Sequence, residues 1–263
     1  MTGVAPGRPP IVERTWTTRG YELDQDRLVH PSTLLRYMEQ LRWDSLGADS
    51  RLDLGRLFRD GHYFVVAAQR LQVNRDPGLA ELLWADLRLG HVGRTSLEFR
   101  TLFREGAAEG APLARGSVTA VHLDPGGRPT PLPDDLVDRA REQVGGWADG
   151  GALQAPDPSG EPPDGACQRE IVVRPSDQDL LQHVNHAVYL SYVDDVRRLC
   201  DGAGGYDGRG GGRIRSATLE YRAEARQGQR LLCRTWAAGE EPFTLAFVIA
   251  REGAVVCRAA LTL

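Results

Sequence analysis

The clearest pattern of hydrophobic and polar positions in the chain covers residues 187–200. Apolar side chains recur there at helical spacing, and charged side chains fill the opposite positions, which predicts an amphipathic helix with one buried face. We expect the buried positions to be Ala187, Leu190, Val193, Val196 and Leu199 or Cys200. We expect the exposed positions to be Asp194, Asp195, Arg197 and Arg198.

A second helical pattern covers residues 32–46 and places Leu34, Leu35, Met38 and Leu41 on one face. A polar turn precedes each helix, and the two turns resemble one another. Residues 24–30 read DQDRLVH and residues 177–183 read DQDLLQH, which agree at five of seven positions with an offset of 153. A repeat of this length is the size of a small domain, so we interpret the chain as two copies of one unit.

Apolar runs and period-two alternation predict strands around each helix. In the first copy they cover residues 11–23, 63–73, 82–89, 95–103 and 113–123. In the second copy they cover residues 168–173, 214–222, 230–237, 243–251 and 255–263. Each copy therefore has the order β-α-β-β-β-β. This order predicts an α+β unit in which the helix packs on one face of an antiparallel sheet, and two such units can join edge to edge.

The two copies predict an N-terminal domain over residues 11–130 and a C-terminal domain over residues 167–263. Residues 131–166 are rich in Pro, Gly and Asp, and they predict an exposed linker with a short helix near residues 134–144. Residues 202–212 contain many glycines, but no strand precedes them and no helix follows. We therefore interpret this segment as a flexible connector and not as a phosphate-binding loop.

Charge and cysteine content exclude several classes of protein. The net charge of -4, without a basic stripe, argues against a nucleic-acid binder. Cys167, Cys200, Cys233 and Cys257 are spread singly, so neither a zinc site nor a disulfide framework is indicated. The N-terminus has no signal-peptide pattern, and no apolar run is long enough to cross a membrane. We expect a cytoplasmic protein that binds no membrane.

The turn before the second helix carries the candidate chemistry. Asp179 and His183 lie just ahead of the helix, and Asn185 suits the N-cap position, so backbone N–H groups near His186 are expected to point outward beside a carboxylate. A carboxylate can activate water, and oriented N–H groups can stabilise an oxyanion. Asp177 is instead expected to hold the turn and cap the helix.

His183 and His186 are three residues apart, which is a spacing that metal ligands can have. No third ligand is apparent in the sequence. We therefore expect neither a metal nor a cofactor.

Two stretches of the chain resemble a known family. Residues 173–197 combine an aspartate pair, His-Val-Asn and a helix that bears Tyr-Leu, which resembles the signature of hotdog-fold thioesterases. Residues 219–225, LEYRAEA, resemble the Leu-Glu-Tyr-Arg-x-Glu segment of the tandem-hotdog acyl-ACP thioesterases. The resemblance covers about residues 11–263 and is strongest in the second copy.

This resemblance implies two tandem hotdog domains, each with a long helix wrapped by an antiparallel sheet, joined as an intramolecular pseudo-dimer. It implies hydrolysis of an acyl thioester, carried by acyl carrier protein or CoA, to the free acid. By motif position, Asp179, His183 and Glu224 match the family's catalytic residues. The chain departs from the plant enzymes in having Leu181 where they have asparagine and Ala225 where they have cysteine.

The first copy offers a possible second site. Aligning residues 71–76 with residues 219–224 places Asp76 opposite Glu224, so that Asp26, His30 and Asp76 form a matching set. Pro31 and Ser32 stand where the second copy has Val184 and Asn185. We therefore expect the second copy to hold the active site.

Several functions fit this sequence. The first is a thioesterase of fatty-acid or polyketide metabolism, and the second is a hotdog dehydratase or hydratase acting on 3-hydroxyacyl thioesters. The third is a non-catalytic acyl-thioester binding protein, in which Leu181 and Ala225 mark a disabled site. The sequence leaves open the acyl length, aliphatic or aromatic substrate, the carrier, and a monomeric pseudo-dimer or a homodimer.

Overall fold

The computed structural model describes residues 9–47, 52–147 and 149–263. Residues 1–8, in which no signal peptide is expected, lie outside the described residues. The chain splits into two compact units. The first contains the chain up to Ala67 and Val73–Leu153, and the second contains Ala68–Gln72 and Gln154–Leu263.

The first unit is an antiparallel sheet with a long helix, as its sequence pattern predicts. Its strands are β1 (Val12–Thr17), β2 (Tyr63–Val73), β3 (Leu82–Val92), β4 (Ser96–Glu105) and β5 (Pro112–Leu123), in the sheet order β1-β3-β4-β5-β2. Its helices are α1 (Pro31–Asp44), α2 (Gly55–Arg59) and α3 (Asp134–Gln143). The residues at the middle of β2, Ala68–Gln72, group with the second unit.

The second unit repeats this arrangement. Its strands are β6 (Cys167–Val172), β7 (Ser216–Tyr221), β8 (Arg230–Glu240), β9 (Phe243–Arg251) and β10 (Ala254–Thr262), in the order β7-β10-β9-β8-β6. Its helix is α4 (Val188–Gly202). Residues Ala68–Gln72 of β2 pair with β7 in antiparallel register. The predicted order of strand, helix and four strands is confirmed in both units.

The first predicted strand was too long. β1 ends at Thr17, and a 3-10 turn at Gly20–Glu22 follows it. The second unit has the equivalent 3-10 turn at Pro175–Asp177, after β6. Each turn leads the chain from the sheet toward the start of the long helix.

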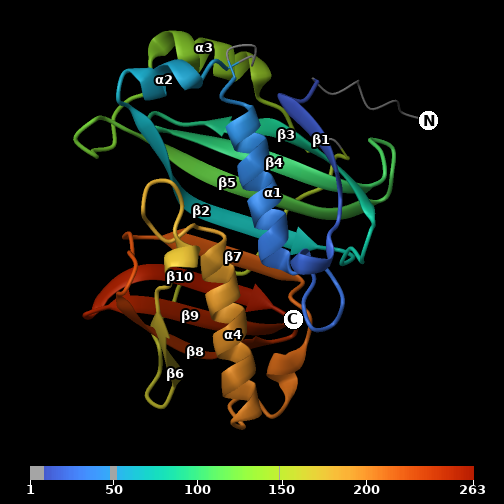
Figure 1. Cartoon of the computed structure of the whole chain (residues 1–263), viewed down its shortest axis with the longest axis vertical. Helices are drawn as coiled ribbons and strands as arrows, with labels where there is room; N and C mark the ends of the chain where they lie inside the picture. The colour runs from blue at the N-terminus through green and yellow to red at the C-terminus, as the bar shows by residue number, and fades with distance from the viewer. Residues whose placement is uncertain (1–8, 48–51, 148) are drawn as a thin grey trace. The chain divides into compact units, whose positions relative to one another are not determined.

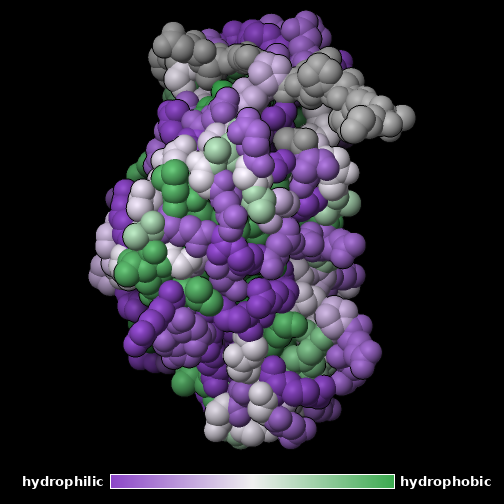
Figure 2. All heavy atoms as spheres, turned by 90° about the vertical axis from the view of Figure 1, so that its right-hand side faces the viewer, coloured by the Kyte–Doolittle hydropathy of each residue, from purple (hydrophilic) through white to green (hydrophobic). Residues whose placement is uncertain are grey.

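Figure 1 shows α1 and α4 each lying across the strands of its own unit. The apolar positions predicted for the α1 core are buried, and in α4 so are Ala187, Leu190, Val193, Val196 and Cys200. Leu199, the alternative to Cys200, is instead 58% exposed. The face shown in Figure 2 is mostly hydrophilic, with hydrophobic residues in small separate groups.

Two charged positions of α4 contradict the sequence pattern. Asp194 and Arg197 were expected on the exposed face, but both are buried. Arg197 Nε donates to Asp194 Oδ1 at 2.8 Å, and its guanidinium also donates to the carbonyl of Gly210. The ion pair provides each charge with a partner, which is what permits its burial.

The glycine-rich segment after α4 is mostly exposed, but it contacts the fold through the buried residues Tyr206 and Gly210, which its composition did not predict. Besides the bond from Arg197, the N–H of Gly210 donates to Asp201 Oδ1 at 3.0 Å. The ring of Tyr206 is buried, and its hydroxyl donates to Thr235 Oγ1 of β8 at 2.8 Å. These contacts attach the segment to both the helix and the sheet.

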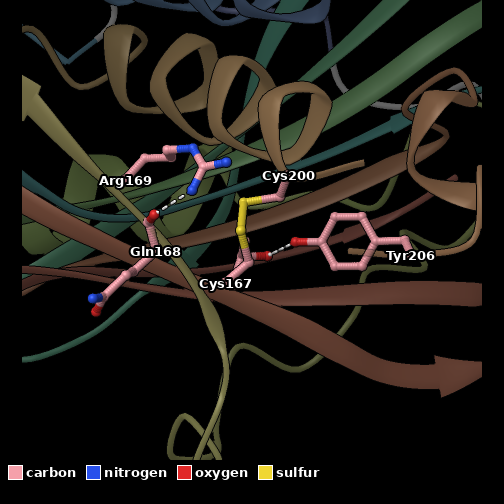
Figure 3. The surroundings of a disulfide bond; sticks show 6 residues. Cys167, Gln168, Arg169, Cys200 and Tyr206 are labelled. Atoms are coloured by element: carbon pink, nitrogen blue, oxygen red, sulfur yellow. Dashed lines mark hydrogen bonds between the residues drawn. A yellow bond between two sulfur atoms is a disulfide. The ribbon is translucent and has the colours of Figure 1, made fainter. Parts of the chain in front are cut away.

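Cys167 of β6 and Cys200 of α4 form a disulfide across 33 residues of sequence (Figure 3). The spacing of the cysteines did not indicate this disulfide, whereas Cys233 and Cys257 are buried and free. No spacing pattern marks this pair, because the fold of the second unit brings the two residues together. Within the described residues, no helix combines the length and the apolar character needed to cross a bilayer.

Candidate active site

The turn that was predicted to carry the chemistry is a tight, closed loop between the 3-10 turn and α4. The N–H of Asp179 donates to the carbonyl of His183 at 2.9 Å, and the N–H of Gln182 donates back to the carbonyl of Asp179 at 3.0 Å. Gln182 takes the left-handed conformation with φ 61°, which lets the chain reverse within these residues. Asp179 and His183 are thereby fixed at the two ends of one short loop.

The carboxylate of Asp179 has one oxygen engaged in this turn. Its Oδ1 accepts the N–H of Leu181 at 2.8 Å, which is an Asx turn. Its Oδ2 has no hydrogen-bond partner among the residues that the structure describes, and the side chain is half-buried. One carboxylate oxygen is therefore held and the other is available to a water or a substrate.

Asp177 holds the turn, as the sequence indicated, but its side chain caps the 3-10 turn and not α4. It is 3% exposed, its Oδ2 accepts the N–H of Arg174 at 2.8 Å and the hydroxyl of Tyr192 at 2.7 Å, and its backbone carbonyl accepts the N–H of Asn185. Burial alone would raise the pKa of the Asp177 carboxyl, but the hydrogen bonds from Arg174 and Tyr192 outweigh it and hold the pKa below its usual value. Asp177 thus ties the turn to α4.

His183 and Glu224 come together although 41 positions separate them. His183 Nε2 contacts Glu224 Oε2, and Arg226 lies beside both, with its guanidinium 2.9 Å from Glu224 Oε1 and 3.4 Å from His183 Nε2. The contact arises because the N–H of Val184 donates to the carbonyl of Ala225 at 2.8 Å. The side chains of His183 and Glu224 are 27% and 48% exposed, so the pair is open to solvent.

The start of α4 differs slightly from the prediction. The helix begins at Val188 and Ala187 precedes it, so Asn185 lies two residues ahead of the cap position. Asn185 therefore makes an Asx turn just ahead of the helix, since its Oδ1 accepts the N–H of Ala187 at 2.9 Å, and its carbonyl accepts the N–H of Val188 at 2.9 Å. The carbonyl of His186 accepts the hydroxyl of Tyr221 at 2.8 Å.

The hydrogen bonds correct the alignment of the two copies. In the first unit the N–H of Asp24 donates to the carbonyl of Leu28 at 2.9 Å, which is the bond that Asp179 and His183 make in the second. Asp24 and Asp179 are 155 positions apart, not the predicted 153. Leu28 therefore corresponds to His183.

The same register assigns the possible second site. His30 corresponds to Asn185, because its Nδ1 accepts the N–H of Ser32 at 3.1 Å and caps α1. Asp76 does correspond to Glu224, since Val29 donates to the carbonyl of Pro77 as Val184 does to that of Ala225. Asp26 lies two residues beyond the aspartate that matches Asp179. The first unit thus has no histidine at the position of His183.

The two departures from the plant enzymes lie next to the candidate residues. Leu181 is exposed, and its N–H donates a hydrogen bond to Asp179 Oδ1. Ala225 is fully buried, and its carbonyl accepts a hydrogen bond from the N–H of Val184. An alanine has no nucleophilic atom, so no covalent intermediate forms at position 225.

A cavity of about 370 Å³ in the second unit is not lined by Asp179, His183 or Glu224. It is lined by residues 161–162 and by parts of β6, β8, β9 and β10. Cys167 points toward α4, because it is bonded to Cys200 of that helix, and its strand partner Thr235 points the same way. Side chains alternate along β8, so Leu232 and Arg234 point away from α4. Within the described residues no cluster of three or more His, Cys, Asp or Glu suits a metal ion.

One protein-family profile matches the part of the chain that holds this site. Residues 160–262 match the profile of the family described as acyl-ACP thioesterase C-terminal domain. A search of curated protein sequences finds no match.

Three solved structures are similar over 95% of the chain and 96% of their own. They are the 12:0-ACP thioesterase from Umbellularia californica (21% identity, TM-score 0.74), a putative oleoyl thioesterase from Lactobacillus plantarum (20%, 0.76) and an acyl-ACP thioesterase from Bacteroides thetaiotaomicron (16%, 0.76). These likenesses confirm the tandem hotdog fold. The profile match confirms the expected reaction class, thioester hydrolysis. Residues 160–262 are thus similar to the acyl-ACP thioesterase C-terminal domain family, within a chain that has the double-hotdog fold.

Proposed function

We propose that this protein hydrolyses acyl thioesters with Asp179, His183 and Glu224 as its catalytic residues. The observation that carries the proposal is the contact between His183 and Glu224 beside the turn of Asp179, within the segment that matches the thioesterase profile. A carboxylate, an imidazole and a helix start in one place are the groups that acyl transfer to water requires.

Asp179 is the general base in this proposal. Its Oδ1 is held by the N–H of Leu181, so Oδ2 accepts a proton from the attacking water. The water oxygen forms a bond to the thioester carbonyl carbon, and the carbonyl oxygen becomes an oxyanion. The positive end of the α4 dipole, beside Asn185 and His186, stabilises that charge.

His183 completes the reaction by protonating the leaving group. When the C–S bond breaks, the sulfur departs with the electron pair and takes a proton from the imidazole, which gives a free acid and a free thiol. Glu224 accepts a hydrogen bond from Nε2 and fixes the orientation of the ring, while Arg226 beside it limits the negative charge there. The proton on Asp179 then returns to His183 through solvent.

The test is release of free thiol from a panel of acyl thioesters by the purified protein. We expect Asp179→Asn and His183→Ala to lower kcat by about 100-fold or more, because each removes one proton-transfer group. Glu170→Gln is the matched control, since Glu170 forms a similar exposed ion pair, with Arg230, away from the turn. Wild-type turnover in both Asp179→Asn and His183→Ala contradicts the assignment.

The proposed substrates are acyl chains on acyl carrier protein or CoA. The similar structures include a 12:0-ACP thioesterase and a putative oleoyl thioesterase, which supports aliphatic chains as substrates. The proposal includes a role in fatty-acid or polyketide metabolism in the cytoplasm. A panel of acyl chains from C8 to C18, each on CoA and on a carrier protein, separates these substrates. If the products gain or lose water with the thioester intact, the protein is a hydratase or dehydratase instead.

A further inference from the structure

Tyr221, the last residue of β7, contacts the first turn of α4 through its hydroxyl. This hydroxyl lies 2.8 Å from the carbonyl oxygen of His186 and 2.6 Å from Oε1 of Gln69 on β2. The ring packs edge-on against Tyr189, with centroids 5.5 Å apart. Gln69 is 152 positions earlier in the chain, and it reaches Tyr221 because it pairs with Leu219 in the sheet.

A single phenol hydrogen cannot serve both of these oxygens. The Tyr221 hydroxyl has one hydrogen to donate, whereas the His186 carbonyl and Gln69 Oε1 are both acceptors. A half-turn of the Gln69 amide exchanges its oxygen and nitrogen and removes the conflict. Gln69 Nε2 then donates to the Tyr221 oxygen, and Tyr221 donates to the His186 carbonyl.

The burial of Gln69 supports this direction of the hydrogen bonds. Gln69 is 1% exposed, and in the unturned amide its Nε2 has no partner among the described residues. A buried N–H donor without a partner is among the least tolerated groups in a folded protein, and an acceptor is tolerated better. In the turned amide, Gln69 Nε2 has the Tyr221 oxygen as its acceptor. Gln69 Oε1 then takes the position in which Nε2 had no partner.

The end of this chain of hydrogen bonds is one peptide group of the candidate active site. The carbonyl of His186 and the N–H of Ala187 belong to the same peptide plane. Tyr221 holds the oxygen of this plane, and Asn185 Oδ1 holds its N–H at 2.9 Å. Because the plane is held at both ends, the backbone at the start of α4 is held in place at this point.

We propose that Gln69 and Tyr221 are positioning residues that hold the His186–Ala187 peptide, and with it the positive end of α4, in the place where the helix stabilises the oxyanion. This inference rests on the proposed thioester hydrolysis for its role in turnover. Neither residue donates to the oxyanion itself. Tyr221 acts through the peptide, and Gln69 acts through Tyr221 by supplying the hydrogen bond that directs its hydroxyl toward His186.

The test compares Tyr221→Phe, Gln69→Leu and the double variant by steady-state kinetics. We expect Tyr221→Phe to lower kcat by about 10- to 100-fold with little change in KM, because a correctly placed helix end acts mainly on the charge that develops in the transition state. Gln69→Leu should show a smaller loss. The double variant should be no worse than Tyr221→Phe, since Gln69 has no route to the peptide without the hydroxyl. Losses that multiply in the double variant overturn the relay.

Tyr206→Phe is the matched control, because Tyr206 is also a buried tyrosine of this unit, whose hydroxyl donates to Thr235. It should lose a similar amount of stability and keep kcat. Amide exchange of Ala187, followed by NMR, gives a readout that needs no turnover. We expect it to accelerate in Tyr221→Phe and Gln69→Leu and not in Tyr206→Phe.

The two hypotheses fail separately in this design. A wild-type protein that cleaves no thioester contradicts the proposed function, while the exchange of Ala187 still decides whether the relay exists. A wild-type protein that cleaves thioesters, together with a Tyr221→Phe variant of equal kcat, contradicts the positioning role alone. Unchanged Ala187 exchange in Tyr221→Phe overturns the relay in either case.

Discussion

Asp177 and Asp179 lie two residues apart in one turn, yet their carboxylates have opposite surroundings. Asp177 is buried and accepts hydrogen bonds from Arg174 and Tyr192, so all of its acceptor capacity serves the fold. Asp179 uses one oxygen for the turn and leaves the other without a partner among the described residues. Sequence alone distinguished the two roles by position in the turn, and the side-chain contacts give the physical reason.

Replacing Asp177 by Asn should destabilise the protein. The variant keeps the size of the side chain but loses the charge that strengthens the bonds from Arg174 and Tyr192. Hydrogen bonds to a charged group are worth about 1.5–3 kcal/mol, so we expect a loss of about 2 kcal/mol in the free energy of unfolding at pH 7. Urea denaturation of both proteins measures this difference.

The difference should depend on pH with a definite sign. The pKa of Asp177 is lowered in the folded protein from its ordinary value of 3.8, so its stabilising contribution is present above that value. It is lost as the pH falls through the lower folded pKa. Wild type and Asp177→Asn should therefore converge in stability in acid, and a difference that widens as the pH falls contradicts this account.

Buried charges are the residues that the sequence pattern misplaced. The helical pattern assigns charged residues to the exposed face, so it predicted that Asp194 and Arg197 are exposed. Their burial depends on each other and on the carbonyl of Gly210, which follows α4 in the chain. A pattern within one helix contains no information about such a partner. Gln69 was missed for the same reason, since its contact lies 152 positions away.

At the scale of the element, α4 is anchored near both ends. Near its start, Tyr192 donates to Asp177, and Tyr221 donates to the carbonyl just before it. Toward its end, Cys200 is bonded to Cys167 of β6 (Figure 3). The amphipathic pattern predicted where the helix lies and which apolar face it buries. It did not predict these attachments, because each depends on residues of other elements.

Removing the disulfide should lower stability and spare turnover. In the chain-entropy account, a bond that closes a loop of 33 residues stabilises the folded state by about 3–4 kcal/mol. Cys200 lies in the last turn of α4 and the candidate site precedes the first, so kcat should stay within about twofold in the Cys167→Ser/Cys200→Ser variant, because separated sites act independently. Thermal unfolding and thiol release measure the two effects.

Reduction provides the control for this prediction. A reducing agent should lower the melting temperature of the wild type toward that of the double variant, and it should leave the double variant unchanged. A reductant that lowers the melting temperature of both proteins equally acts on something other than the bond between Cys167 and Cys200. Equal melting temperatures of oxidised wild type and double variant would show that the bond does not stabilise the fold.

At the scale of the whole molecule, the chain is a duplication whose two units share one strand order. The similar turns in the sequence indicated the duplication. Matching identical residues, however, gave an alignment of the two copies that is wrong by two positions. The backbone sets it correctly. Arg27 and Gln182 both have φ 61°, and Tyr37 and Tyr192 both donate to an acidic residue of the preceding 3-10 turn. Each of these pairs is 155 positions apart.

The corrected register predicts that only one unit catalyses thioester hydrolysis. His30 caps α1 through Nδ1, so His30→Ala should lower stability by about 1 kcal/mol, which is typical of a lost N-cap. His183→Ala should instead lower kcat by about 100-fold or more, because it removes the proposed acid of the reaction. Urea denaturation and thiol release, measured on both variants, separate the two roles. A loss of kcat in His30→Ala as large as that in His183→Ala would mean that the first turn also takes part in catalysis.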